Sequence, residues 1–442
     1  MKIRLIEFVM KHVFIKLLDL LISTNILKWY KLIAELRGKK TSEICDWQFK
    51  RLKFLLKHAY NNTVYYRRLF DNLNLQPNDI LSLNDLNKIP PLSKQDIKKN
   101  FENIKARNIK KIPHFFKSTG GSTGDPLQYI LDRDSWSFIF ANRLQAWEKI
   151  GYTIGQRYVA LGSSSLFPIN KRSIKNRLYN LLIGRIPVNA VNLSDQKLEI
   201  IVTLLQKRKI RYIFGYSSAL YLLAKYVITN NIYLKHIKGC ISTSEILLEN
   251  YRETIIQAFN CKIIDAYGAY DGGINAYKIF DDFYKVGYNC YIETKKTNIE
   301  KIDNELLTTD LLNFAFPFIR YSIGDEAIIS NKGIKNYKGQ TITKLMGRTP
   351  DIIKLSNGNI LTGPGFTILF KDLNVDAYRI VQKTELEITC QILVNKSFVK
   401  KEEILILNTL KKHAGKECII NIEYVKDFKI LDSGKLGYFI SN

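Results

Sequence analysis

Short apolar runs alternate with amphipathic runs through the middle of the chain, and this alternation restricts the fold more than any other feature. Four of the apolar runs are predicted to be buried strands, at 157–161, 211–214, 239–242 and 262–266. The longer runs between them repeat apolar residues at helical spacing, at 198–207, 217–229 and 245–259. Strands that alternate with helices in this way indicate βαβ units and a largely parallel sheet. Ligands bind such sheets where the strand carboxyl ends open into loops.

Three loops at these predicted strand ends carry unusual residues. Gly215–Ser218 and Ala266–Gly273 combine glycine with tyrosine and small polar residues. Ser242–Glu245 has the pattern of a capping box, whose helix N-terminus could face an anion. A capped turn without a ligand is the alternative interpretation of each loop.

A loop rich in glycine and hydroxyl residues precedes this region. It runs from Lys117 to Pro126 and is predicted to lead into a strand at 127–131 and a helix at 134–147. Its members with backbone freedom or a hydroxyl are Ser118, Thr119, Gly120, Gly121, Ser122, Thr123 and Gly124. Successive backbone N–H groups and hydroxyls form a cradle for phosphate oxygens. The pattern is neither a Walker A sequence nor a Rossmann turn, and a flexible linker is the alternative.

Two further segments carry single charged candidates. Asp325 follows a glycine at a predicted strand end, where a carboxylate suits the two vicinal hydroxyls of a ribose; a plain turn aspartate is the alternative. Lys435 lies between glycines near the C-terminus and by itself is only a surface lysine.

A domain boundary is predicted at the polar stretch 348–351. It separates the long region of alternating strands and helices from a small α+β unit. The predicted elements of that unit are strands at 375–382, 386–394 and 418–425 and a helix at 402–413.

Charge and cysteine usage narrow the possible partners. The 442 residues suffice for two or three domains. The net charge of +26 suits nucleic acid, an anionic membrane or a polyphosphate substrate. No arginine-rich block alternates with aromatic residues, which argues against nucleic acid. The six cysteines are scattered without CxxC spacing, as expected for reduced thiols of a cytosolic protein without a zinc site.

The N-terminal segment 1–22 is predicted to be an apolar helix with a narrow charged stripe, too interrupted to cross a bilayer. Either it packs on the body of the protein, or it lies on an anionic membrane surface with Lys2, Arg4, Lys11 and Lys16 towards the head groups. A helix is also predicted over 47–72, and the basic residues of 171–185 are expected in a solvated loop.

Taken in order, these segments resemble the adenylate-forming ligase superfamily, and within it the phenylacetate–coenzyme A ligase branch with its CapK-type capsular-polysaccharide members. The resemblance covers about residues 49–439. It is carried by the segments 52–60, 65–68, 85–94, 118–126, 215–218, 267–271, 321–325, 347–348 and 433–435.

The resemblance implies an α/β fold with a helical extension at 1–48, a large multi-sheet adenylation domain at 49–348 and a small, mobile α+β lid domain at 349–442. It implies that a carboxylate attacks the α-phosphate of ATP and that an acceptor then displaces AMP. In the implied roles, residues 118–124 hold phosphates, Tyr267 and Gly268 lie near the adenine, and Asp271 holds Mg²⁺ through ATP. Asp325 and Arg348 take the ribose, and Lys435 neutralises charge at the α-phosphate. Substrate-lining candidates are Tyr216, Ser217, Ser242 and Glu245.

The sequence departs from the branch at several positions. Asp271 stands where the family has glutamate, and Tyr270 replaces a small hydroxyl residue. Pro350 replaces a charged hinge residue and restricts φ there. Cys290 is the one cysteine in the region where branch members carry a structural zinc, so we expect none.

Three functions fit these expectations. The first is an ATP-dependent acid ligase of surface-polysaccharide assembly, with a sugar amine or hydroxyl as acceptor, in the cytoplasm or at the inner face of the membrane. The second is an aryl-acid ligase with CoA as acceptor. The third is a non-catalytic scaffold that keeps a nucleotide site.

Overall fold

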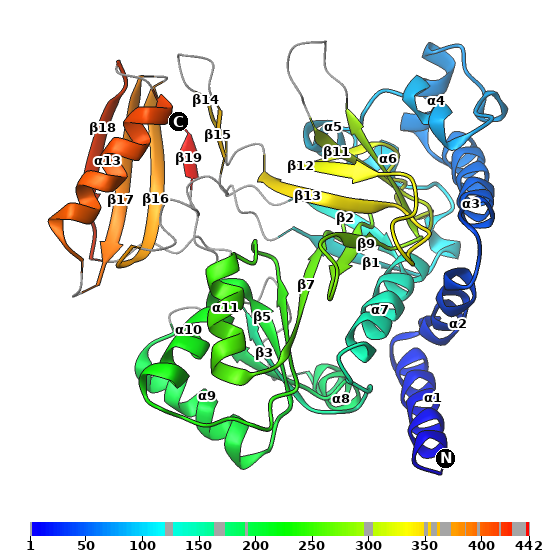
Figure 1. The fold of residues 1–442 in the computed structure, drawn as a ribbon. Coiled ribbons are helices and arrows are strands. Elements are labelled where there is room, and N and C mark those ends of the chain that lie inside the picture. Colours follow the sequence, from blue (N-terminus) through cyan, green and yellow to red (C-terminus); the bar gives the residue numbers. More distant parts are fainter. Residues whose placement is uncertain are drawn as a thin grey trace.

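A mixed sheet of 11 strands organises the larger part of the chain, in the order β10-β11-β12-β13-β9-β8-β7-β6-β5-β3-β4 (Figure 1). A separate sheet of four strands, β18-β17-β16-β19, lies near the C-terminus. The computed structural model describes residues 2–119, 127–162, 173–190, 193–295, 304–348, 352–354, 360–362, 373–384, 386–395, 398–414, 417–426 and 439–441. The α/β class expected from the sequence is confirmed.

The parallel half of the large sheet is built from the predicted βαβ units. Its strands are β3 (Tyr158–Gly162), β4 (Arg185–Asn189), β5 (Tyr212–Tyr216), β6 (Gly239–Thr243) and β7 (Lys262–Gly268). The connecting helices are α9 (Asp195–Lys207), α10 (Ser217–Thr229) and α11 (Glu249–Phe259). Their apolar faces form one buried cluster with the strands, centred on residues such as Ile213, Leu220 and Cys240. This burial is why the pattern of the sequence predicts the region well.

Two expectations in this half are wrong. Within 173–185, helix α8 (Ile174–Leu182) and the start of β4 stand where a loop was expected, although no residue of α8 is buried. Ser173 caps that helix by accepting a hydrogen bond from the N–H of Asn176. The helix predicted from 245 begins only at Glu249, after Leu248 at the N-cap. Ser242 and Thr243 end β6, and Ser244 has a left-handed φ of 66°, so Ser242–Glu245 is not the capping box of α11.

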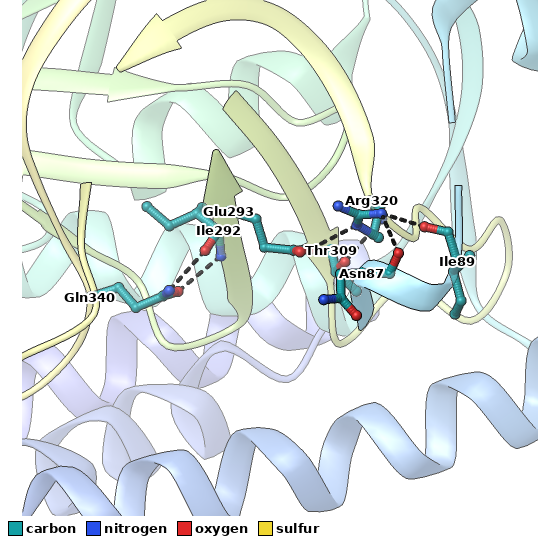
Figure 2. Close-up of polar contacts among 7 residues, drawn as sticks. All are labelled: Asn87, Ile89, Ile292, Glu293, Thr309, Arg320 and Gln340. Atoms are coloured by element: carbon teal, nitrogen blue, oxygen red, sulfur yellow. Dashed lines mark hydrogen bonds and ion pairs between the residues drawn. The ribbon is translucent and has the colours of Figure 1, made fainter. Parts of the chain in front are cut away.

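The other half of the large sheet is antiparallel. It contains β8 (Asn275–Lys278), β9 (Tyr284–Val286), β10 (Cys290–Lys295), β11 (Glu305–Asp310), β12 (Tyr321–Ser330) and β13 (Thr341–Arg348). The Gln340 side chain joins this half across strands, since its Nε2 donates to the Ile292 carbonyl at 2.8 Å and its Oε1 accepts from the Ile292 N–H at 2.9 Å (Figure 2).

Helices at the N-terminus pack on the sheet. They are α1 (Lys2–Ile22), α2 (Ile26–Arg37), α3 (Thr41–Asn62) and α4 (Val64–Asn72), followed by the short helices η1 (Pro77–Asp79), η2 (Leu83–Lys88), α5 (Lys94–Lys99), α6 (Phe101–Ile104) and η3 (Ile109–Lys111). Ile15 and Leu18 of α1 are fully buried, and α2 lies along α7 (Arg133–Glu148) (Figure 1). The second half of α1 therefore packs on the body. None of the described helices is long and apolar enough to span a bilayer.

The C-terminal region forms the expected small α+β unit. Its elements are β14 (Ile352–Lys354), β15 (Ile360–Thr362), β16 (Val375–Thr384), β17 (Glu387–Val394), α13 (Lys400–Ala414), β18 (Ile419–Tyr424) and β19 (Phe439–Ser441). Ile380, Ile388 and Ile406 are buried between α13 and the sheet.

Two buried carboxyls hold the start of α7. One directly precedes the helix in the chain, and the other lies on β11 of the large sheet. Asp132, at the end of β2 (Gln128–Asp132), caps α7 by accepting from the N–H of Asp134 at 2.9 Å. Asp310 accepts a hydrogen bond from the Ser135 hydroxyl at 2.6 Å. Burial raises the pKa of Asp132 to about 7 and that of Asp310 to about 6. Both carboxyls therefore bind a proton more tightly in the folded chain than in the unfolded one, where the pKa of aspartate is about 3.9.

The free energy of unfolding should therefore fall as the pH rises from about 4 to 7, because the folded state binds more protons across that window. Asp132→Asn keeps an oxygen that caps α7 but cannot titrate, so we expect a flatter dependence. The difference should be a few kcal/mol over the window, since one pKa unit corresponds to about 1.4 kcal/mol. Urea unfolding at several pH values measures it, with Asp46→Asn on the exposed surface of α3 as matched control. An unchanged slope in Asp132→Asn would contradict the assignment.

Candidate active site

A hairpin closes the base of the glycine loop. Strands β1 (His114–Ser118) and β2 pair antiparallel, with Ser118 opposite Gln128. The Thr119 N–H donates to the Leu127 carbonyl at 2.9 Å, and the Leu127 N–H donates to the Thr119 hydroxyl at 2.8 Å. The loop thus leaves and rejoins the body at one fixed point. Its members Gly120, Gly121, Ser122, Thr123 and Gly124 lie outside the described residues, as does Lys435. The sequence pattern predicted β2 but missed β1.

Three candidate residues come together where the parallel and antiparallel halves meet. Tyr267 lies in β7, and its hydroxyl donates to the Asp325 carboxylate at 2.7 Å. Asp325 in β12 lies opposite Arg348 in β13. The sequence separates Tyr267 from Asp325 by 58 positions, so the sheet is what places them side by side. Asp325 is 8% exposed, and the tyrosine hydroxyl fixes the orientation of its carboxylate.

The turn after β7 presents Asp271. Gly272 and Gly273 have φ values of 86° and 72°, and a Cβ on Gly273 would lie 2.4 Å from the Asp310 Cγ atom. The Thr308 hydroxyl donates to the Gly272 carbonyl at 2.9 Å. The Tyr321 hydroxyl donates to the Asp271 carboxylate at 3.3 Å. No local sequence pattern indicates a role for Tyr321 or Thr308, although Tyr321 begins the motif that contains Asp325.

The surroundings of Asp271 fit a metal ion that a nucleotide shares. Within the described ranges, no group of three or more histidine, cysteine, aspartate or glutamate side chains could hold a metal ion. Mg²⁺ commonly binds one or two carboxylates together with substrate phosphates. A single carboxylate held by a tyrosine hydroxyl is compatible with that arrangement.

The candidate substrate residues hold two loops together. The hydroxyls of Ser217 and Ser242 lie 2.5 Å apart, and Ser217 also donates to the Glu245 carbonyl at 3.0 Å. The Glu245 carboxylate accepts from the Ser218 N–H at 2.9 Å, so it binds the first turn of α10. Ser217 and Ser242 are fully buried and Tyr216 is nearly so. These side chains therefore fix the loops that follow β5 and β6.

A buried arginine fixes the start of β12, the strand that carries Asp325 (Figure 2). Arg320 is 8% exposed, and its Nε lies 3.2 Å from the Glu293 carboxylate. One terminal nitrogen donates to the carbonyls of Asn87 and Ile89, and the Arg320 N–H donates to the Thr309 hydroxyl at 3.0 Å. Burial raises the pKa of Glu293, and the Arg320 guanidinium opposes that shift.

The fold is similar to that of solved CoA ligases. The structure matches that of 2-hydroxyisobutyryl-CoA ligase in its postadenylation state with a TM-score of 0.70 at 15% identity, covering 91% of this chain and 90% of that one. The same enzyme in its thioesterification state gives a TM-score of 0.58. The anthranilate CoA ligase AuaEII gives 0.50 over 73% of this chain and 65% of that one, at 12% identity.

The sequence relationship is to CapK. Residues 353–442 match the family model described as the CapK C-terminal domain. The chain is 25% identical to Protein CapK of Staphylococcus aureus over 423 residues, which is 94% of this chain and 92% of that protein. It is 39% identical to phenylacetate-coenzyme A ligase of Escherichia coli over 103 residues, 22% of this chain and 23% of that protein. The resemblance found in the motifs is thus confirmed: the chain is similar to CapK over most of its length, to phenylacetate-coenzyme A ligase over a shorter stretch, and in fold to solved CoA ligases.

The contacts of Arg320 yield a stability prediction. Arg320→Met should lower the free energy of unfolding by about 3 kcal/mol, because it leaves the largely buried Glu293 carboxylate without its ion-pair partner. Chemical denaturation measures the loss. Arg67→Met is the matched control, since the Arg67–Asp71 pair at 3.0 Å is exposed and should contribute less than about 1 kcal/mol. Adding Glu293→Gln to Arg320→Met should recover part of the loss; a double variant no better than the single one would show that the ion pair is unimportant.

Proposed function

We propose that the chain is an ATP-dependent carboxylic-acid ligase. A carboxylate oxygen of the acid attacks the α-phosphorus of ATP, the bond to the β-phosphate oxygen breaks, and pyrophosphate leaves with that electron pair. An acceptor nucleophile then attacks the acyl carbon, and AMP leaves. The observation that carries the proposal is the pairing of Tyr267 with Asp325 opposite Arg348, at the edge where the turn bearing Asp271 also lies. The relationship to CapK and the phenylacetate-coenzyme A ligases supports it.

Each candidate residue then has a physical task. Ser118, Thr119 and the five residues that follow bind phosphate oxygens through N–H groups and hydroxyls. Asp325 accepts hydrogen bonds from the ribose hydroxyls, and Tyr267 both orients that carboxylate and lies beside the base. Asp271 would hold a Mg²⁺ ion, which screens the phosphate charge. In-line displacement at phosphorus needs positioning and positive charge more than acid–base groups.

Lys435 supplies positive charge from the small C-terminal unit. A cation on a separately folded unit can be brought in for adenylation and withdrawn for the second step. The structure is more similar to one ligase after adenylation, with a TM-score of 0.70, than during thioesterification, with 0.58. In this proposal residues 349–442 are the lid and residues 49–348 the nucleotide-binding domain.

For the acceptor we propose a sugar hydroxyl or amine in surface-polysaccharide assembly. Similarity to CapK over 94% of the chain supports this choice over CoA. The net charge of +26 and the exposed Val13, Leu17 and Leu20 of α1 suit work beside an anionic membrane surface in the cytoplasm. The CoA alternative draws support from the 39% identity to phenylacetate-coenzyme A ligase over a shorter stretch.

Lys435→Ala tests the catalytic role. It should lower ATP–pyrophosphate exchange by at least about 100-fold, because the ammonium group stabilises charge that develops in the transition state. ATP affinity, measured by calorimetry, should change less than about threefold. Lys426→Ala removes an exposed lysine from the same unit and is the matched control. Equal losses of ATP affinity and of exchange would contradict the catalytic role of Lys435. If none of the acids tested supports pyrophosphate exchange by the wild type, only the scaffold function remains.

The acceptor is tested with whichever acid supports exchange. We expect AMP release to rise when an amino sugar or nucleotide sugar is added, and no thioester to form with CoA. Mass spectrometry of the acyl product separates the two. A CoA thioester, with no acylated sugar, would replace the polysaccharide proposal by the CoA-ligase alternative.

A further inference from the structure

Helix α8 turns its apolar face away from the rest of the protein. Ile174, Leu178 and Leu181 are exposed, from 42% for Leu178 to 80% for Ile174. Their i, i+4, i+7 spacing places them on one face of the helix. Asn176 and Tyr179 lie on the opposite face and are partly buried, and Tyr179 packs against the main apolar cluster. A surface helix normally buries its apolar face, so α8 lies the other way round.

The second half of α1 exposes an apolar stripe of the same kind. Val13, Leu17 and Leu20 have the same i, i+4, i+7 spacing and are 44%, 46% and 80% exposed. Ile15 and Leu18 lie on the opposite face and are fully buried. Packing on the body therefore uses only the inner face of α1, and the outer face is left apolar.

The two helices are attached to one point of the body. They contact each other at the same end of the molecule (Figure 1). A Cβ on Gly155, in the turn before β3, would lie 3.1 Å from the ring of Phe14 of α1. A Cβ on Gly184, just after α8, would lie 1.9 Å from the Gln156 carbonyl oxygen in the same turn. Because both helices rest on the body by their inner faces, their outer faces lie side by side. We call the six exposed apolar side chains the α1–α8 surface.

Positive charge accompanies this surface. Lys16 is exposed beside the apolar stripe of α1, and Lys175 and Arg177 are exposed on the two sides of the α8 stripe. The sequence from 149 to 194 contains no aspartate or glutamate. Its seven basic residues are Lys149, Arg157, Lys171, Arg172, Lys175, Arg177 and Arg185.

The acidic residue in the second half of α1 is turned inward. Residues 12–22 contain one, Asp19. Its carboxylate accepts from the N–H groups of Ile26 and Leu27 at 2.7 and 3.1 Å and from the Thr24 hydroxyl at 2.8 Å. It thus closes the turn into α2 and leaves the positive charge beside the apolar stripe uncompensated by this helix half.

Apolar side chains bordered by lysine and arginine match an anionic bilayer surface. The apolar groups enter the boundary between head groups and acyl chains, and the cations meet the lipid charges. A second copy of the chain is a poorer occupant, because each chain carries a net charge of +26 and two such surfaces would bring like charges together.

We infer that the α1–α8 surface binds anionic lipid at a membrane interface, and that α8 is a necessary part of it. The inference extends the membrane contact proposed for α1 to a second helix. It does not depend on ligase activity, because the surface consists of none of the residues assigned to ATP or to the acid.

Vesicle flotation of the full chain without ATP or acid tests the inference. The wild type should float with vesicles that contain about one-third phosphatidylglycerol in phosphatidylcholine, and much less with phosphatidylcholine alone. The triple variant Ile174→Gln, Leu178→Gln, Leu181→Gln should bind at least about tenfold more weakly, because it keeps the helix and its charges but loses the apolar stripe. Lys16→Gln with Lys175→Gln should weaken binding to the anionic vesicles only.

The matched control removes three exposed apolar residues elsewhere. Leu222→Gln, Ile256→Gln and Ile404→Gln lie on α10, α11 and α13, where the native side chains are 41%, 43% and 50% exposed. This variant should bind vesicles within about twofold of the wild type, since single exposed apolar residues are ordinary on protein surfaces. Circular dichroism and thermal unfolding check that both triple variants are folded.

A direct readout of insertion uses an introduced indole. Leu178→Trp should be quenched by lipids brominated on the acyl chains when anionic vesicles are added, and Leu222→Trp on α10 should not. Quenching at neither position, with the protein bound to the vesicles, would show that α8 stays in water and would overturn its role.

Other outcomes separate the inference from the ligase function. A wild type that exchanges pyrophosphate but does not float would overturn the inference alone, as would an α8 triple variant that floats like the wild type. A wild type that floats through α8 but exchanges with no acid would overturn the ligase function alone. Sedimentation without lipid checks the remaining occupant: a dimer that the α8 triple variant dissociates would assign the surface to a second copy and overturn the lipid inference.

Discussion

The buried carboxyl of Asp310 is the contact on which the candidate site depends. It accepts hydrogen bonds from the Ser135 hydroxyl of α7 and from the N–H of Leu312, at 2.6 and 3.0 Å. The Asp310 side chain also packs directly on Gly273: a Cβ added to Gly273 would lie 2.4 Å from the Asp310 Cγ atom. Because a buried carboxyl must be satisfied by its surroundings, α7, β11 and the turn bearing Asp271 are held in one arrangement.

The same region fixes the glycine loop. The Asn313 side chain accepts from the Asp132 N–H at 3.1 Å and donates to the Ile130 carbonyl at 3.0 Å, so the strand that closes the loop is attached beside Asp310. The antiparallel half of the sheet brings Asp325 from the other direction, with Arg320 holding the start of its strand. In the proposed function, the loops that bind the flexible triphosphate thus begin and end on rigid elements, which lowers the entropic cost of positioning them.

Local pattern explains what could be predicted and what could not. Helix α10 spans Ser217–Thr229 as the sequence predicted. The apolar residues whose spacing predicts the helix are the same residues that it buries against the sheet. Helix α8 was missed because its basic residues suggested a solvated loop. The segment does face solvent, with no buried residue, but it forms a helix with a serine cap and contact with α1. The pairs Tyr267–Asp325 and Tyr321–Asp271 are 58 and 50 positions apart. Only the strand order of the sheet brings them together, and no local pattern encodes that order.

Tyr270 is a departure from the family pattern that directly precedes the candidate metal carboxylate, Asp271. The family pattern has a small hydroxyl residue at this position, and the motif alone gives no reason for a ring there. In the structure the Tyr270 ring packs, partly buried, against the main apolar cluster, while its neighbour Asp271 accepts a hydrogen bond from Tyr321. The larger side chain therefore buries apolar surface beside the turn that bears Asp271. The departure from the pattern adds packing to this turn and leaves the contact between Asp271 and Tyr321 in place.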